Sequence, residues 1–255
     1  MESLLKRTLP YSLFHALRNC KKTVQKLNFK GDQVYCACCG STFKAFAPFG
    51  VPRTPNRLCL QCDSLERHRL LWMFLEKQTS LFTKPSKLLH VAPERVFFKR
   101  FKQAKSIDYY PADKFPKGYP AGTKHLDLLQ PGMPDHSFDA VICNHVFQYI
   151  IEDRSAIKNV YNMLRPGGWA ILQVPIDWNR DVSYEDYTIT DPRERERIYG
   201  LSEHVRWYGK DYAHRLEEAG FRVEMHDFID RFTPEETDRY GFWKGEKIFY
   251  CLKSS

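Results

Sequence analysis

From residue 87 onward, short apolar runs alternate with longer stretches that mix apolar and polar residues. The apolar runs predict strands, and the stretches between them have the spacing of amphipathic helices. Strands are expected at 87–92, 106–112, 138–144 and 169–176, in a short segment ending at Asp127, and in FRVEMHDF and KIFYCLK near the end. Helices are expected through ERVFFKRFKQ, EDRSAIKNVYNMLRP and GKDYAHRLEEAG. This alternation predicts an α/β fold with a doubly wound parallel sheet.

The first 82 residues show a different pattern. Residues 1–29 predict a basic amphipathic helix. Residues 30–82 predict a small module rich in cysteine and turns, followed by a connecting helix through SLERHRLLWMFLEKQ, for which Asp63 or Ser64 is the expected N-cap. The expected domain division is therefore a helix over 1–29, the module with its helix over 30–82, and an α/β domain over 83–255.

Composition narrows the class of protein. Of the 255 residues, 43% are hydrophobic and 15% are aromatic, which excludes a disordered chain. Charged residues interrupt every apolar run well short of the length that crosses a bilayer, so no transmembrane helix is expected. The N-terminal sequence has no long apolar core and no small-residue cleavage site, as a secretory signal would have. We expect a soluble protein of the cytoplasm.

Charge is distributed unevenly along the chain. Residues 1–105 contain 20 lysine and arginine residues against 6 acidic residues, whereas residues 106–255 contain 19 against 25. A basic first half is compatible with RNA, with an anionic membrane surface or with an acidic substrate, and equally with an ordinary solvated surface. RNA binding and peripheral membrane contact are therefore open alternatives at this point.

Five of the eight cysteines lie within residues 36–62. They include two C-x-x-C pairs, Cys36 with Cys39 and Cys59 with Cys62, separated by 19 residues. Each pair can form a knuckle that points two thiolates at one ion, and two knuckles complete a tetrahedral zinc site. Four protein ligands leave no open position, so the spacing predicts a structural Zn²⁺ rather than a catalytic one.

Candidate binding residues follow the expected strands, because a parallel α/β sheet binds its ligand outside the carboxyl ends of its strands. Asp113 can accept hydrogen bonds from both hydroxyls of a ribose, with Asp108 as the competing choice. Asp127 offers an acceptor and Leu128 an apolar surface to an adenine ring, although Asp127 can also simply support a turn. The candidate residues for a nucleotide-type cofactor are Val91, Ala92, Glu94, Asp113, Asp127, Leu128 and Asn144.

The chain resembles the class I S-adenosylmethionine-dependent methyltransferases from about residue 87 to its end. The resemblance is carried by LLHVAPE, YYPADKF, HLDLL, SFDAVICNHVFQYI, MLRPGGWAILQVP and AGFRVE. A narrower resemblance, to a bacterial subgroup with an N-terminal zinc module, is carried by CACCG, SLERHRLLW, HVAPE and DPRERERIYGLSEHVRWYG. It implies a Rossmann-like, seven-stranded sheet, S-adenosyl-L-methionine as cofactor and methyl transfer as the activity.

Two positions depart from that family's pattern. Its first loop is usually rich in glycine, whereas here the loop is HVAPE, with Ala92 as the only small residue and Pro93 unable to donate an N–H. Glu94 is then the candidate acceptor for the cofactor's ammonium group. Many members that act on small molecules have a histidine where this chain has Tyr149. A nicotinamide-dependent dehydrogenase shares the layout but requires G-x-G-x-x-G after the first strand, which the chain lacks.

The acceptor is expected to be a small molecule, such as a sugar or another metabolite, because residues 177–210 form a long polar insertion rich in aromatic residues that suits a lid. An RNA methyltransferase and a non-catalytic protein that retains the fold are the alternatives. The candidate general bases are His145, His204 and Tyr149, and the candidate substrate-binding residues are Arg206, Trp207 and Tyr208. For these residues ordinary packing is the competing interpretation.

Overall fold

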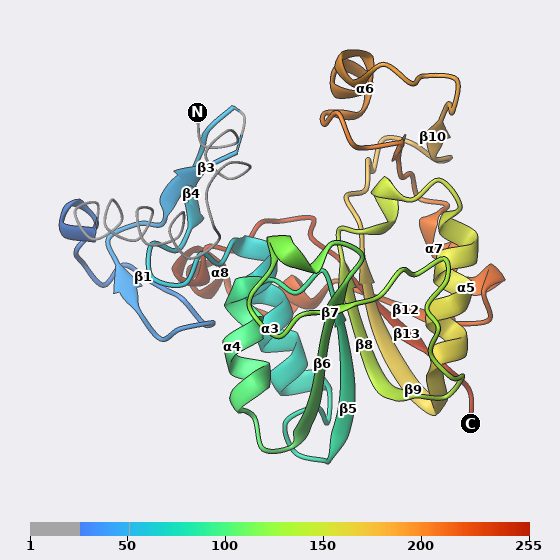
Figure 1. The fold of residues 1–255 in the computed structure, drawn as a ribbon. Coiled ribbons are helices and arrows are strands. Elements are labelled where there is room, and N and C mark those ends of the chain that lie inside the picture. Colours follow the sequence, from blue (N-terminus) through green and yellow to red (C-terminus); the bar gives the residue numbers. More distant parts are fainter. Residues whose placement is uncertain (1–25, 51) are drawn as a thin grey trace.

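A seven-stranded sheet forms the centre of the protein, as seen in a computed structural model that describes residues 26–50 and 52–255 (Figure 1). The strand order is β12-β13-β9-β8-β5-β6-β7. The strands are β5 (Ser86–Val91), β6 (Ile107–Asp113), β7 (Lys124–His125), β8 (Phe138–Asn144), β9 (Leu164–Gln173), β12 (Arg222–His226) and β13 (Ile248–Leu252). The helix predicted over 1–29 lies almost entirely outside the described residues.

The sheet is doubly wound, as predicted. β5 pairs in parallel with both β6 and β8, and β9 continues the parallel part beyond β8. β13 is antiparallel to both of its neighbours, β9 and β12. The chain therefore runs outward from β5 to β7 and then returns to β8 on the other side of β5. The strand order reverses between β5 and β8, which is where this kind of sheet binds a ligand.

Helices cover both faces of the sheet (Figure 1). The chain contains α3 (Glu66–Gln78), α4 (Arg95–Gln103), α5 (Asp153–Met163), α6 (Pro192–Tyr199), α7 (Tyr212–Glu218) and α8 (Pro234–Tyr240), with short 3₁₀ turns at Pro116–Gly118, Phe147–Tyr149 and Phe228–Arg231. On one face, α3 and α4 bury Phe74, Phe97 and Phe101 in an apolar core with the sheet. On the other, α5 and α7 bury Val160 and Leu216 in a second core.

The cysteine-rich module consists of two short antiparallel hairpins. β1 (Val34–Tyr35) pairs with β2 (Thr42–Phe43), and β3 (Ala47–Phe49) pairs with β4 (Thr54–Leu58). The core under α3 and α4 continues into this module without a break. The domain boundary that we predict between residues 82 and 83 crosses that shared core, and it stays a prediction.

The start of α3 corrects the expected N-cap. Neither Asp63 nor Ser64 caps the helix: the N-cap is Leu65, whose backbone N–H donates to Nδ1 of His68 over 3.0 Å. Arg69, one turn further, is fully buried and donates to the backbone oxygens of Tyr240 and Gly241 at 2.7 and 2.8 Å. It therefore joins the module to the segment that follows α8.

The insertion between β9 and α7 is an ordered unit. β10 (Tyr184–Glu185) and β11 (Arg206–Trp207) pair in antiparallel fashion, and α6 lies between them in sequence. The Asp191 side chain caps α6 by accepting from two backbone N–H groups at 2.9 Å, and the helix ends at Gly200 with a φ of +81°. The insertion stands above the carboxyl ends of the parallel strands (Figure 1). Among residues 26–50 and 52–255, no helix is long and apolar enough to span a membrane.

Candidate functional site

A cavity of about 550 Å³ opens at the carboxyl ends of the parallel strands; we refer to it as the first cavity. It lies at the point where the strand order reverses. Its volume falls within the range of about 300–1,000 Å³ that is usual for small-molecule sites. Among the predicted residues, those that line it are Val91, Ala92, Asp113, Asp127, Leu128, His145 and Tyr149.

Asp113 ends β6 at the wall of the first cavity. One of its carboxylate oxygens accepts a 2.6 Å hydrogen bond from the backbone N–H of Phe115. Partial burial raises the pKa of Asp113, while the bonds from Phe115 and the Tyr119 hydroxyl act in the opposite direction. The chain thus holds a carboxylate in a fixed orientation at the cavity, as an acceptor of ribose hydroxyls must be held.

Asp127 is more heavily engaged by the protein itself. One carboxylate oxygen lies 2.7 Å from Nζ of Lys114, and the other accepts from the backbone N–H of Leu129 over 3.0 Å. The hydrogen bond from Lys114 lowers the pKa of Asp127. This residue supports the turn, and the buried Leu128 beside it offers the apolar surface at this side of the cavity.

Two non-glycine residues at strand ends adopt a left-handed backbone conformation. Ala92, after β5, has a φ of +50°, and His145, after β8, has a φ of +55°. The backbone N–H of Ala92 donates to the oxygen of Ala112, and that of His145 donates to the oxygen of Gln173. Such a conformation costs about 1–2 kcal/mol in residues other than glycine. Ala92 thus retains the backbone shape that glycine favours in a cofactor-binding loop.

The structure corrects the predicted roles of Glu94 and Asn144, neither of which lines the first cavity. The Glu94 carboxylate lies 2.5 Å from Nε2 of the fully buried His90, and Nδ2 of Asn144 donates to it over 2.9 Å. Burial alone would raise the pKa of Glu94, but the hydrogen bond and charge of His90 outweigh it and lower the pKa to about 2. Because His90 lies in β5 and Asn144 ends β8, the Glu94 carboxylate connects these two strands beneath the loop, and its oxygens are already occupied.

His145 lies between the first cavity and a second one described below. Burial lowers its pKa to about 3, and the positive charge of Arg67 acts in the same direction. The ring is therefore neutral near pH 7. Its Nε2 is buried, and no described residue forms a hydrogen bond with it. A pKa of about 3 also makes this imidazole a weak proton acceptor, so it is poorly suited to act as a general base near pH 7.

The other two candidate bases form a pair. The ring of Tyr149, which is partly exposed in the first cavity, meets the ring of His204 edge-on at 4.9 Å between centroids. His204 is buried, lines neither cavity, and its Nδ1 lies 3.1 Å from the backbone oxygen of Tyr199. His204 therefore packs behind Tyr149 and does not reach either cavity, contrary to what a predicted general base requires.

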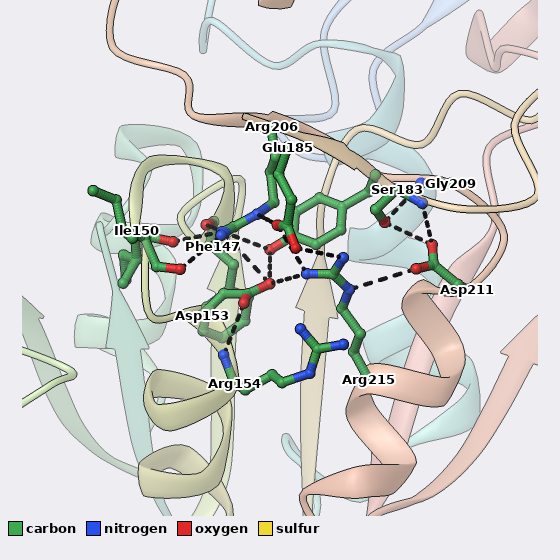
Figure 2. Close-up of polar contacts among 12 residues, drawn as sticks. Phe147, Ile150, Asp153, Arg154, Ser183, Glu185, Arg206, Gly209, Asp211 and Arg215 are labelled. Carbon is green, nitrogen blue, oxygen red and sulfur yellow. Dashed lines mark hydrogen bonds and ion pairs between the residues drawn. The ribbon is translucent and has the colours of Figure 1, made fainter. Parts of the chain in front are cut away.

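Arg206 does not point into either cavity, contrary to the prediction of a substrate contact. Figure 2 shows its guanidinium in a buried cluster of charges, 2.7 Å from Glu185 and 3.5 Å from Asp153. Its remaining donors reach backbone oxygens between residues 147 and 151. Arg215 on α7 joins the same two carboxylates. The cluster fastens the insertion to α5 and α7, and the chain's own acceptors occupy the Arg206 guanidinium.

The two residues after Arg206 point in different directions. Tyr208 is fully buried and donates to Asp153 over 2.7 Å, so it belongs to the same charge cluster and not to a substrate site. Trp207 faces the second cavity, and its indole N–H donates to the backbone oxygen of Ile198 in α6 over 2.7 Å. Of the three predicted substrate-binding residues, Trp207 lines the second cavity, and Arg206 and Tyr208 line neither the first nor the second.

The second cavity has a volume of about 400 Å³ and lies between the cysteine-rich module, the end of β9 and the loop before β13. Three tryptophans and several charged side chains surround it, and His145 separates it from the first cavity. The charged and tryptophan side chains of its lining are Arg57, Glu66, Arg67, Trp178, Trp207, Trp243, Lys244, Glu246 and Lys247.

Most of this second lining was not predicted from the sequence. The spacing of apolar residues predicts the helix that contains Arg67. It does not predict which side of that helix faces a cavity. Trp243 and Lys244 lie in a loop with no motif. One signal was available: Arg67 belongs to the SLERHRLLW segment, whose charged residues lie next to the second cysteine pair.

Cys36, Cys39, Cys59 and Cys62 place their sulfur atoms within 4.8 Å of one another. The sulfurs of Cys36 and Cys62 are 3.6 Å apart, and those of Cys39 and Cys59 are 3.7 Å apart. A tetrahedral zinc ion with bonds of about 2.3 Å requires separations of about 3.8 Å between the sulfurs. The four cysteines thus have the geometry of one zinc site, whereas Cys38 is directed at the backbone oxygen of His68.

The two cysteine pairs have the same backbone turn. The N–H of Gly40 donates to the oxygen of Cys36, and that of Asp63 donates to the oxygen of Cys59. Gly40 and Asp63 have φ values of +74° and +65°. Two equivalent knuckles are the form expected of a closed, structural zinc site.

Comparison with known proteins gives one match in sequence and several in fold. The family model described as "Methyltransferase domain" matches residues 73–226. No protein of curated function matches the chain. Similar solved structures include a SAM-dependent methyltransferase from Archaeoglobus fulgidus (14% identity, 73% of this chain and 94% of that chain covered, TM-score 0.46). A SAM-dependent methyltransferase from Mesorhizobium loti has 14% identity and a TM-score of 0.47, and the match covers 72% of this chain and 98% of that chain.

A third similar structure is the 1,6-didemethyltoxoflavin-N1-methyltransferase of Burkholderia thailandensis, with 1,6-didemethyltoxoflavin and S-adenosylhomocysteine bound. It has 11% identity to this chain, coverage of 74% of this chain and 79% of that chain, and a TM-score of 0.48.

Proposed function

Because the chain belongs to the methyltransferase-domain family, whose model matches residues 73–226, we propose that it binds S-adenosyl-L-methionine in the first cavity and methylates a small molecule. The observation that carries the proposal is the position of Asp113. Its oriented carboxylate ends β6 beside the point where the strand order reverses, in a cavity of about 550 Å³.

The residues of the first cavity fit this cofactor. Asp113 accepts the hydrogen bonds of the ribose hydroxyls, and Leu128 provides an apolar surface for the adenine. Ala92 keeps the loop after β5 narrow and in the left-handed conformation, so that the chain passes close to the amino-acid part of the cofactor. Glu94 does not contribute its carboxylate here, since His90 and Asn144 hold it beneath the loop.

The bound cofactor supplies an electrophilic methyl group on a sulfonium sulfur. The protein must orient the acceptor toward that group and exclude water, and orientation alone is worth up to roughly 7–11 kcal/mol in well-oriented intramolecular reactions. His145 lies between the two cavities and is neutral near pH 7, so it lines the path between donor and acceptor, while its pKa of about 3 makes it a weak general base. Tyr149 closes the same side of the first cavity.

The four cysteines fit a Zn²⁺ ion that stabilises the module. Four sulfur ligands leave no position for substrate, so the ion has no part in the methyl transfer. The size of the two cavities supports a small acceptor over RNA.

Calorimetry on the zinc-loaded full-length protein tests the proposal. S-adenosylmethionine and S-adenosylhomocysteine should each bind with a stoichiometry of one, and NAD⁺ should not bind. Binding of NAD⁺ in place of either S-adenosyl compound would refute the proposal.

A further inference from the structure

Arg67 lies on the wall of the second cavity together with Glu246, whose pKa the positive charge of Arg67 lowers against the larger opposing effect of burial. It lies in the first turn of α3, and its Nε is buried. No residue in the described part of the chain accepts a hydrogen bond from its guanidinium or forms an ion pair with it. A partly buried charge that lacks a partner is costly, so such a group indicates a missing anion.

The other two cations that line the interior of the cavity already have partners. Arg57 forms a two-point contact with the Glu66 carboxylate, and Lys247 pairs with Asp227. Lys244 is exposed at the rim and adds positive charge there. The remaining acid is Glu246; burial raises its pKa to about 7, so it only partly compensates the positive charge near neutral pH. The cavity therefore has a surplus of positive charge.

Three of the five tryptophans of the chain line this cavity, and they come from three different segments. Trp178 follows β9, Trp207 lies in β11 and Trp243 precedes β13. Cationic side chains lie against two of them, Lys247 at 5.5 Å from the centre of Trp178 and Arg57 at 5.4 Å from that of Trp243. Indole rings offer flat apolar surfaces on which a ring-shaped molecule can stack.

We propose that the second cavity is the acceptor site, and that the acceptor is a small organic anion with a ring-shaped body. The ring lies among the three tryptophans, and a carboxylate or phosphate of the acceptor binds Arg67. This inference rests on the proposed function, because it takes the first cavity as the site of the methyl donor. His145 lines both cavities and therefore lies where donor and acceptor would meet.

The cysteine-rich module thereby becomes part of the acceptor site. Arg57 lies in β4, between the two cysteine pairs, and Arg67 follows Cys62 by five residues. The four-cysteine cluster thus flanks Arg57 on both sides in sequence and ends five residues before Arg67. The module therefore has a specific task in addition to its contribution to the core: it supplies the anion-binding wall.

Tryptophan fluorescence of the zinc-loaded, full-length protein tests this inference, because three of its five fluorophores line the site. The probes are phenyl phosphate, inorganic phosphate and the neutral benzyl alcohol, each titrated in the presence of S-adenosylhomocysteine. Phenyl phosphate should give saturable quenching with at least a tenfold lower dissociation constant than either of the other two. Equal affinities for phenyl phosphate and benzyl alcohol, or no saturable quenching, would overturn the inference.

Variants assign the anion to Arg67. Arg67→Gln should weaken phenyl phosphate binding by roughly 10- to 100-fold, as expected for lost charge-assisted hydrogen bonds. Arg67→Lys, which keeps the charge, should retain most of the affinity even if Arg67→Gln folds poorly. The matched control is Arg53→Gln, because Arg53 is exposed in the same module and lines neither cavity. Unchanged binding of phenyl phosphate by folded Arg67→Gln would overturn the assignment.

Two further readouts separate the related hypotheses. The affinity for S-adenosylhomocysteine should be the same in wild type, Arg67→Gln and Arg53→Gln; its absence in wild type would refute the proposed function itself. A ten-nucleotide single-stranded RNA should not displace phenyl phosphate. Displacement by this RNA at a concentration below that of the probe would overturn the small-acceptor inference in favour of a nucleic-acid substrate.

Discussion

Asn144, the last residue of β8, donates a 2.9 Å hydrogen bond to the carboxylate of Glu94, which precedes α4. The bond connects the ends of the two strands between which the strand order reverses. His90 holds the same carboxylate from within β5. In a loop that lacks glycine, an acidic side chain would otherwise extend into the cofactor site. Here the Glu94 side chain turns beneath the loop, and Val91 and Ala92 line the first cavity in its place.

Glu94→Gln should therefore destabilise the fold in a pH-dependent manner. The pKa of Glu94 is lowered from 4.5 to about 2 in the folded protein, so the charged form contributes stability that is fully present above pH 4.5 and is lost as the pH falls toward 2. The shift corresponds to about 3 kcal/mol. Urea unfolding should show this difference from wild type at pH 7 and a narrowing gap between pH 4.5 and 3.

The control for that experiment is Glu196→Gln, on the exposed surface of α6. Its stability should follow that of wild type at every pH. A difference between Glu94→Gln and wild type that does not change with pH would show that the contact is steric and not electrostatic.

Asp113→Ala should weaken binding of S-adenosylmethionine by roughly 1.5–3 kcal/mol, the range of hydrogen bonds to a charged acceptor. The matched control is Asp108→Ala. Asp108 is exposed near the start of β6, whereas Asp113 is at the end that faces the first cavity. Calorimetry of both variants checks this. If the loss appeared in Asp108→Ala instead, the ribose would have to bind outside the first cavity.

Arg206→Ala should lower the melting temperature strongly, because it leaves the buried Asp153 and Glu185 with fewer partners (Figure 2). Removing one member of a buried ion cluster typically costs about 3–5 kcal/mol. The control is Arg197→Ala, whose ion pair with Glu194 is on the surface. Thermal unfolding of both variants measures the effect. Unchanged stability together with lost turnover would restore the substrate role that we predicted for Arg206 from the sequence.

Cys59→Ser should destabilise the protein more than Cys38→Ser, because Cys59 belongs to the sulfur cluster and Cys38 does not. Elemental analysis of protein purified without chelator should find one zinc per chain in wild type and in Cys38→Ser. Removing the metal should also lower the melting temperature, since the module shares its core with the sheet. A preparation that is folded and contains no zinc would contradict the metal assignment.

The approximate positions of the main strands along the chain could be predicted from local patterns, although β9, predicted at 169–176, is Leu164–Gln173. The run 138–144 is apolar except for Asp139 and Asn144, and it forms β8 with the same bounds. The cysteine spacing was equally informative, since two knuckles bring their sulfurs together whatever the surrounding fold. Asp113 and Ala92 could be placed at the same edge of the sheet, where both line the first cavity, because the ends of parallel strands share one edge.

Side-chain partners that are distant in sequence could not be predicted in this way. Arg206 looked available for substrate because nothing near it in sequence pairs with it, yet its partners are Asp153 and Glu185, 53 and 21 positions earlier. Arg67 shows the opposite case. Nothing in the sequence separates it from the other charged residues of its helix, and only the tertiary arrangement places its unpartnered Nε beside a cavity.

We propose that the methyl donor occupies the first cavity with its methyl group directed toward His145. The acceptor then lies on the other side of His145, in the second cavity. A crystal structure of the zinc-loaded protein with S-adenosylhomocysteine and phenyl phosphate tests this arrangement most directly. We predict the ribose on Asp113, the adenine against Leu128, the sulfur directed toward His145, and the phosphate on Arg67. S-adenosylhomocysteine among the three tryptophans, or bound away from Asp113, would contradict the claim.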